Sequence, residues 1–167
     1  MKPIVLIGPP GAGKSTVGKA LAEQLSLEFL DTDTLIEQST GKSITDIFVV
    51  DGEQAFRAIE FQMLRTVLEK VDAIISLGGG APISDEAQKL ISDTDCQVVF
   101  LDISLSTAAP RVGFNRDRPL LLGNPRAQWQ ALSDQRRPIY EFLSDQTIKV
   151  DTLSLAEIVE AIKKGMQ

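Results

Sequence analysis

A glycine-rich loop that ends in Lys-Ser follows directly on the first apolar run of the chain. Residues 8–15 read Gly-Pro-Pro-Gly-Ala-Gly-Lys-Ser and match the pattern Gly-x-x-x-x-Gly-Lys-Ser/Thr at every fixed position. The run 4–7 is apolar on both faces, which predicts a buried strand, and residues 14–25 carry apolar side chains at helical spacing. Between a strand and a helix, such a loop turns backbone N–H groups toward phosphate oxygens. The sequence therefore predicts a nucleotide phosphate site on an α/β fold.

The residues of this loop predict where the nucleotide phosphates and a metal ion would bind. Lys14 is expected to reach the β- and γ-phosphates, and Ser15 to bind Mg²⁺. The expected nucleotide contacts in the loop are Gly11, Ala12, Gly13, Lys14, Ser15 and Thr16. A second Gly-Lys-Ser, at 41–43, has Ile36 where the first glycine should be and no buried strand before it. We interpret that stretch as the end of one helix followed by the start of the next, at Ser43.

Short apolar runs alternate with helical patterns along the rest of the chain. Further strands are predicted at 28–30, 72–77, 98–101 and 147–150, and further helices at 34–39, 52–70, 85–91, 104–112 and 154–164. A helix that contains Trp129 is expected to break at Pro138, and Pro110 to end or kink its own helix. Five strands that alternate with helices predict an α/β fold with a parallel sheet and helices on both faces. At 167 residues, the chain predicts a single domain.

Composition excludes several partners and several kinds of chemistry. Asp and Glu number 23 against 17 Lys and Arg, and this net charge of −6 argues against nucleic acid or an anionic membrane as a partner. The chain has no histidine, which excludes a Ser-His-Asp triad and a histidine base. Its one cysteine, Cys96, lies in an apolar stretch typical of a core residue and of a reducing compartment. No apolar run is long enough for a signal peptide or a membrane span, so we expect a cytoplasmic protein.

Polar residues and glycines at predicted strand ends are candidates for a second substrate site. Asp31 and Asp33 follow the second strand, where one carboxylate can serve Mg²⁺ and the other a substrate hydroxyl; a turn with a helix N-cap is the alternative. Gly78–Gly80 follow the third strand, and either leave N–H groups free for an anion or a hydroxyl, or form only a tight turn. Asp102 follows the fourth strand without a second carboxylate beside it, so Asp31 is preferred for the metal.

Arginines must supply local positive charge if this acidic chain binds anions. Arg57 lies on the predicted long helix with acidic neighbours, and Arg118 lies in the polar loop 113–125. Arg136 lies at a predicted helix end. Each of them, taken singly, is typical of a solvated surface residue. The chain has no Asn-Lys-x-Asp motif for a guanine base and is too short for a motor protein, which leaves a small-molecule kinase.

Taken together, these segments resemble shikimate kinase over nearly the whole chain. The resemblance rests on residues 8–16, 30–33, 41–48, 51–60, 76–80, 118–121 and 136–140, in the order of that family. It implies a nucleoside-monophosphate-kinase-like sheet in strand order 2-3-1-4-5, a substrate-binding region at about 32–60 and a lid at about 113–125. It also implies ATP-dependent phosphorylation of the 3-hydroxyl of shikimate in aromatic amino acid biosynthesis. Mg²⁺ would be the metal, shikimate and ATP the small-molecule partners, and the enzyme a monomer.

The resemblance also assigns roles to single residues of this chain. Those expected to hold shikimate are Asp33, Arg57, Gly79, Gly80 and Arg136. Those expected to serve the phosphates and Mg²⁺ are Lys14, Ser15 and Arg118, with Asp31 assisting the metal through water and Arg111 against the adenine. The expected catalytic residues are Asp33, Lys14 and Arg118. These roles agree with the chemistry, because a guanidinium fork suits a carboxylate and an aspartate can orient the reacting hydroxyl.

The chain departs from the family's pattern after residue 152. Family members commonly carry a longer adenine loop there, whereas residues 153–155 lead directly into the last predicted helix. Side-chain contacts to the adenine, and the strictness of the ATP preference, therefore stay open. Two other functions stay open as well: another small kinase with a phosphate loop, such as a gluconate kinase, and a catalytically silent nucleotide-binding module.

Overall fold

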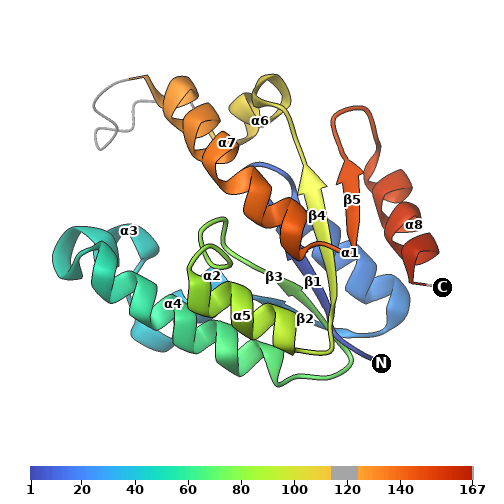
Figure 1. Cartoon of the computed structure of the whole chain (residues 1–167), viewed down its shortest axis with the longest axis horizontal. Helices are drawn as coiled ribbons and strands as arrows, with labels where there is room; N and C mark the ends of the chain where they lie inside the picture. The colour runs from blue at the N-terminus through green and yellow to red at the C-terminus, as the bar shows by residue number, and fades with distance from the viewer. Residues whose placement is uncertain (114–123, 167) are drawn as a thin grey trace.

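The computed structural model of the chain describes residues 1–113 and 124–166. Within them, five strands form one sheet in the order β2-β3-β1-β4-β5, and every neighbouring pair is parallel (Figure 1). The strands are β1 (Ile4–Ile7), β2 (Glu28–Asp31), β3 (Ala73–Ser76), β4 (Gln97–Asp102) and β5 (Gln146–Lys149). The predicted α/β class, the parallel sheet and the strand order are confirmed.

Helices connect the strands, as crossovers between parallel strands require. They are α1 (Lys14–Leu25), α2 (Thr32–Thr40), α3 (Ile44–Asp46), α4 (Glu53–Leu68), α5 (Asp85–Asp93), α6 (Leu105–Arg111), α7 (Pro125–Leu143) and α8 (Leu155–Gly165), with a π-helical turn η1 (Ile47–Asp51) before α4. Gly41 ends α2 with a φ of 69°, and the Ser43 side chain accepts a hydrogen bond from the backbone N–H of Asp46 at the start of α3. The interpretation of the second Gly-Lys-Ser as a helix end and a helix start is therefore confirmed.

Both faces of the sheet are buried, because side chains of the central strand alternate between two hydrophobic clusters. Ile4 and Leu6 of β1 lie in a cluster with buried residues of α1 and α8. Val5 and Ile7 lie in a second cluster with buried residues of α4, α5 and the end of α7. A slip of one residue in β1 would exchange the two faces, so close packing of both clusters holds the register that positions the loops.

A smaller cluster joins α2, η1 and α4 beside the sheet. It contains the buried side chains Ile36, Ile47 and Phe56, with partly buried residues such as Phe48 packed against it. Figure 1 shows α3 and the start of α4 at the end of the molecule opposite α8. This cluster holds the start of α4, which carries Arg57, in a fixed position relative to β2.

Pro138 does not break α7, so that prediction was wrong. The proline lacks the N–H that would bond to the carbonyl of Asp134, and that loss is local. Buried contacts hold the helix on both sides of it, since Trp129 is 7 % exposed and Tyr140 is 0 % exposed. Tertiary packing therefore outweighs the local preference for a helix end. Helix α6, in contrast, ends at Arg111, one residue past Pro110, as expected for a proline that ends its helix.

Cys96 is free and buried where β4 begins, which confirms it as a core residue. Within residues 1–113 and 124–166, no helix is both long and apolar enough to cross a membrane.

Candidate active site

The loop between β1 and α1 depends on glycine at three positions. Gly8, Gly11 and Gly13 have φ values of 145°, 86° and 90°, which L side chains rarely adopt. A Cβ on Gly8 would also lie 2.5 Å from the backbone oxygen of Leu101 in β4. The glycines of the motif are therefore required by backbone conformation and by close approach to β4.

Lys14 lies across the mouth of this loop. Its Nζ donates hydrogen bonds to the backbone oxygens of Gly8, at 2.8 Å, and Pro9, at 3.0 Å. Desolvation by the surrounding chain lowers the pKa of Lys14 to about 8, against the raising effects of Asp33 and Asp31. The ammonium is thus charged at neutral pH and placed where a phosphate on the loop would meet it.

Ser15 and Asp31 form the part of the site that suits a metal ion. The Ser15 hydroxyl donates to Oδ2 of Asp31 at 2.5 Å and lies 3.5 Å from Oγ of Ser76. The register of the sheet explains this, because Asp31 of β2 pairs with Ser76 of β3. Oδ1 of Asp31 accepts a hydrogen bond from the backbone N–H of Thr34. Asp31 is therefore also the N-cap of α2, which was the alternative prediction for this residue.

The donor set at this position fits Mg²⁺. Hydroxyl and carboxylate oxygens are hard ligands, and Mg²⁺ commonly takes one or two carboxylates, substrate phosphates and water. Among the described residues, no group of three or more His, Cys, Asp or Glu side chains gathers as a metal site. Ser15 and Asp31 could therefore supply only part of a Mg²⁺ shell, and phosphate and water would have to complete it.

Each glycine of the turn after β3 faces one predicted substrate residue. A Cβ on Gly78 would lie 2.7 Å from Oδ1 of Asp33, and a Cβ on Gly79 would lie 3.3 Å from Nη1 of Arg136. A Cβ on Gly80 would lie 2.8 Å from the guanidinium carbon of Arg57. The three residues come from α2, α7 and α4, so a side chain on any of these glycines would displace the end of a predicted substrate residue.

Arg57 is held by both charge and aromatic packing. Its Nη1 donates to Oε1 of Glu60 at 2.5 Å, and its Nε lies 3.7 Å from Oε1 of Glu53. The guanidinium lies 5.3 Å and 5.9 Å from the ring centres of Phe56 and Phe48. Glu60 is buried, and burial raises the pKa of its carboxyl against the lowering effect of Arg57. Arg57 is therefore a positioned group rather than a solvated one, and Glu60 is a site residue that sequence reasoning left as a mere helical neighbour.

Two neighbouring cavities lie on either side of the glycine turn. One, which we call the cationic cavity after the guanidinium groups of Arg57 and Arg136, has a volume of about 400 Å³ and is also lined by Glu60 and Gly80 among others. The other, of about 270 Å³, is lined by loop residues around Lys14 together with Asp31, Asp33, Gly78 and Gly79. Because Gly79 and Gly80 are consecutive, the cationic cavity and the phosphate loop adjoin at this turn.

Asp33 lies on the phosphate side of the turn, near Lys14. Burial raises the pKa of the Asp33 carboxyl, and Asp31 adds to the rise, whereas Lys14 and Arg57 oppose it. A carboxylate in this position faces the loop that would carry a terminal phosphate. It is therefore placed to accept a hydrogen bond from a hydroxyl that approaches that phosphate.

A third cavity, of about 410 Å³, extends from the other side of the phosphate loop. Arg111 lines it and donates from Nη1 to the backbone oxygen of Gly11 at 3.2 Å. Leu153, Leu155 and Ile158 line it as well, which places the residues left open by the sequence beside Arg111. An aromatic base on this side would lie between a guanidinium and aliphatic side chains. The signal in the sequence that could have indicated this surface is the pair of apolar residues Leu153 and Leu155, which directly follows residue 152.

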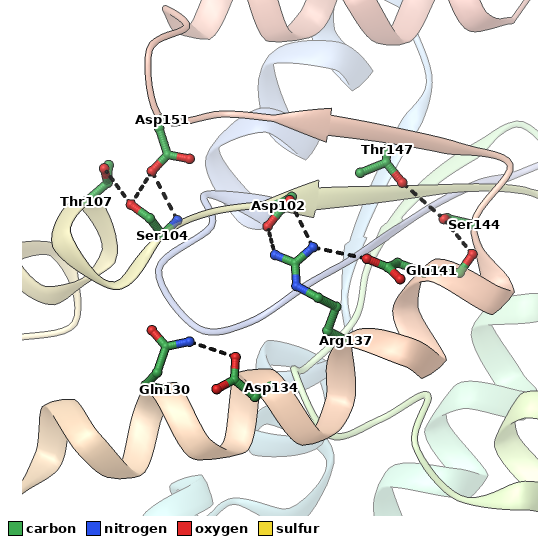
Figure 2. Close-up of polar contacts among 10 residues, drawn as sticks. All are labelled: Asp102, Ser104, Thr107, Gln130, Asp134, Arg137, Glu141, Ser144, Thr147 and Asp151. Atoms are coloured by element: carbon green, nitrogen blue, oxygen red, sulfur yellow. Dashed lines mark hydrogen bonds and ion pairs between the residues drawn. The ribbon is translucent and has the colours of Figure 1, made fainter.

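Asp102 forms an ion pair with Arg137 of α7. Figure 2 shows it at the end of β4, where both of its carboxylate oxygens face the guanidinium of Arg137. Nη1 of Arg137 donates to Oδ2 of Asp102 at 3.1 Å, and the same nitrogen lies 3.1 Å from Oε1 of Glu141. The preference for Asp31 over Asp102 beside the loop serine agrees with this geometry.

The remaining predicted residue lies outside the described part of the chain. Arg118 belongs to residues 114–123, as does most of the predicted lid at 113–125. Both stay predictions.

Comparison with known proteins identifies the family. The sequence model described as "Shikimate kinase" matches residues 10–167 of this chain. The chain belongs to the shikimate kinase family. A curated shikimate kinase of Thermobifida fusca (strain YX) is 46 % identical over 162 residues, which cover 97 % of this chain and 93 % of that protein.

Solved structures agree with this family. The structure described as shikimate kinase from Acinetobacter baumannii in complex with shikimate superposes with a TM-score of 0.92 at 32 % identity, over 99 % of this chain and 93 % of the other. A gluconokinase from Sinorhizobium meliloti 1021 superposes with a TM-score of 0.60 at 21 % identity, over 99 % of this chain and 91 % of the other. The second likeness shows only the shared fold, so the gluconate kinase alternative is not favoured over the shikimate kinase family.

The lowered pKa of Lys14 predicts a pH dependence of nucleotide binding. Only the ammonium form attracts phosphate, and in the free protein this form is lost as the pH rises through about 8. The affinity for Mg·ADP should therefore fall as the pH rises above about 8, by at most about tenfold for each pH unit. Calorimetric titrations between pH 7.5 and 9.5 measure this. Adenosine, which has no phosphate, is the control ligand and should show no such trend; a flat profile for Mg·ADP would contradict the placement of Lys14.

Proposed function

We propose that this protein transfers the γ-phosphoryl group of ATP to the 3-hydroxyl of shikimate, giving shikimate 3-phosphate and ADP. The observation that carries the proposal is the turn Gly78–Gly80, against which Asp33, Arg136 and Arg57 each pack beside the phosphate loop. Membership of the shikimate kinase family supports the same reaction. We also propose a cytoplasmic location, on the basis of the apolar patterning, and a monomeric enzyme, which the family resemblance implies.

Shikimate binding would use the cationic cavity. Its carboxylate matches the guanidinium groups of Arg57 and Arg136, which face Gly80 and Gly79 from α4 and α7. Glu60 and the aromatic rings around Arg57 hold that guanidinium in place before the substrate arrives. A preorganised arginine loses little side-chain freedom on binding, so more of the interaction stabilises the complex.

Asp33 would orient the reacting hydroxyl. Its carboxylate lies beside Gly78, on the phosphate side of the turn, and interacts electrostatically with Lys14. Phosphoryl transfer proceeds through a loose transition state, so deprotonation of the attacking hydroxyl can occur late. Asp33 can then accept the proton as the bond to phosphorus forms, which requires no stronger base.

The phosphate loop would bind and orient the triphosphate. Lys14 and the N-terminus of α1 favour negative charge where the β- and γ-phosphates would lie. Ser15 and Asp31 would hold Mg²⁺, which when bound neutralises charge on the phosphates. Arg118 is proposed to add positive charge to the transferred group, and the segment around it to exclude water. Positioning and charge neutralisation then account for most of the catalysis.

An ADP-release assay tests the reaction directly. The protein should release ADP from Mg·ATP when shikimate is added, and not when gluconate or AMP replaces shikimate. Release with gluconate alone would establish the alternative kinase. Binding of Mg·ADP without turnover on any of the three acceptors would establish a silent nucleotide-binding module.

Arg57→Ala should impair shikimate use selectively. Loss of one charged partner of a carboxylate costs about 2–4 kcal/mol, so kcat/KM for shikimate should fall roughly 30- to 1,000-fold. The KM for ATP should change little, because Arg57 lines the cavity that the phosphate loop does not reach. Arg65→Ala, on the exposed side of the same helix, is the control and should leave both constants unchanged. An equal loss for ATP would show that the assignment of Arg57 is wrong.

Asp33→Asn and Asp31→Asn should separate the roles of the two carboxylates. Asp33→Asn should remove most of kcat and leave binding of Mg·ADP nearly unchanged, since an amide cannot accept the hydroxyl proton. Asp31→Asn should instead raise the Mg²⁺ concentration needed for half-maximal activity, because Asp31 contacts Ser15. Steady-state kinetics with Mg²⁺ titrations distinguish the two. If Asp33→Asn kept kcat and Asp31→Asn lost it, the two roles would have to be exchanged.

A further inference from the structure

Helix α7 contacts both sides of the sheet and both loops of the site. Trp129, near its start, belongs to the hydrophobic cluster that includes α1 and α8. Tyr140 and Leu143, near its end, belong to the cluster on the opposite face with α4 and α5. Arg136 lies between them, on the same helix, against Gly79. One helix therefore spans the two hydrophobic clusters and carries a substrate residue between them.

Two buried side chains of α7 each donate one hydrogen bond to a loop carbonyl. Nε1 of Trp129 donates to the backbone oxygen of Pro10 at 3.0 Å, and the Tyr140 hydroxyl donates to the backbone oxygen of Gly79 at 2.6 Å. The side chains are 7 % and 0 % exposed, so water cannot readily replace either donor. These two bonds fix a peptide unit in each of the two loops.

Fixing a carbonyl also aims the N–H of the next residue. The peptide unit is planar, and no cis bond occurs in the described residues, so the N–H points away from the carbonyl of the same unit. The Pro10 carbonyl shares its unit with the N–H of Gly11, and the Gly79 carbonyl shares its unit with the N–H of Gly80. Neither N–H makes a backbone hydrogen bond within residues 1–113 and 124–166. Both are therefore available to a ligand on the side opposite α7.

Each aimed N–H belongs to a residue that lines a cavity. Gly11 lines the cavity at the phosphate loop, and Gly80 lines the cationic cavity with Arg57 and Arg136. A hydrogen bond accepted by a carbonyl also polarises its peptide unit and strengthens the N–H as a donor. Burial raises the pKa of the Tyr140 hydroxyl, against the lowering effect of the positive charge of Arg136.

An ion pair fixes α7 between these two contacts. Figure 2 shows Arg137 of α7 reaching Asp102 at the end of β4, with Glu141 on its other side. The Arg137 guanidinium also lies 5.5 Å from the ring centre of Phe100 in the same strand. The helix is thus anchored to β4 between Trp129 and Tyr140.

We propose that Trp129 and Tyr140 are positioning residues for the two substrates. Trp129 orients the 10–11 peptide unit so that the Gly11 N–H faces the nucleotide phosphates. Tyr140 orients the 79–80 peptide unit so that the Gly80 N–H faces shikimate. That the ligand facing the Gly80 N–H is shikimate rests on the proposed function. The ligand facing the Gly11 N–H needs only to be a nucleotide.

The test is a pair of substitutions that each remove one donor and keep an aromatic ring. In Tyr140→Phe, the dissociation constant for shikimate should rise about 5- to 20-fold, and that for Mg·ADP should stay within about twofold. In Trp129→Phe, the pattern should be reversed. Calorimetry with each ligand alone measures both constants without relying on turnover. Gln130→Ala is the control on the same helix and should change neither constant, because within the described part of the chain its side chain hydrogen-bonds to Asp134 and not to either loop (Figure 2).

A merely structural role would give a different pattern. If each variant weakened both ligands to the same degree in step with a lower Tm, or if neither changed any constant, the proposal would be overturned. Failure of the proposed function is distinguishable, because the unsubstituted protein would then bind Mg·ADP but not shikimate.

The unsubstituted protein provides a second measurement that does not depend on the folding of a variant. Trp129 is the one tryptophan of the chain, and its indole N–H contacts the phosphate loop. Mg·ADP should therefore shift its emission maximum, and shikimate alone should not. An equal shift with shikimate alone would contradict the assignment of Trp129 to the nucleotide side.

Discussion

Hydrogen bonding between the parallel strands β2, β3 and β1 is the interaction on which the rest of the site depends. It places the carboxyl ends of the three strands side by side, so that Asp31, Ser76 and the phosphate loop meet at one edge of the sheet. The phosphate loop then continues into α1 on one face of the sheet, and the glycine turn leads to α5 on the other. The phosphate loop, the aspartates and the glycine turn are therefore neighbours because of strand order, although up to 72 residues separate Gly8 from Gly80.

Local charge counteracts the acidity of the whole chain. With a net charge of −6, the protein as a whole does not attract anions, yet Lys14, Arg57 and Arg136 gather around the two cavities. Lys14 has Asp33 and Asp31 in its surroundings, and Arg57 forms ion pairs with two glutamates. Such pairing offsets the cost of burying a positive charge before the ligands bind. It also holds the charged groups in the orientation in which they would meet an anionic ligand.

At the acceptor site, three glycines leave room for polar side chains from three helices. Side chains from α2, α4 and α7 pack directly on Gly78–Gly80, and a methyl group on any of the three would meet one of them. The site is therefore set by contacts between elements rather than by one motif. Helix α7 adds a further layer, because its buried Trp129 and Tyr140 bond to the carbonyls of both loops.

The sequence by itself determined the α/β class, the position and glycine requirement of the phosphate loop, and the interpretation of residues 41–43 as a helix end and start. These follow from local patterns, in which backbone conformation and burial depend on neighbours along the chain. Sequence reasoning also selected Asp33, Arg57, Gly79, Gly80 and Arg136 through the family resemblance, and the structure brings those residues together. Only the tertiary structure decided that α7 continues through Pro138, that Glu60 holds Arg57, that Asp102 pairs with Arg137 and that Leu153 and Leu155 lie beside Arg111. Each of these rests on a contact between segments far apart in the chain or on packing that outweighs a local preference, and neither leaves a periodic signal in the sequence.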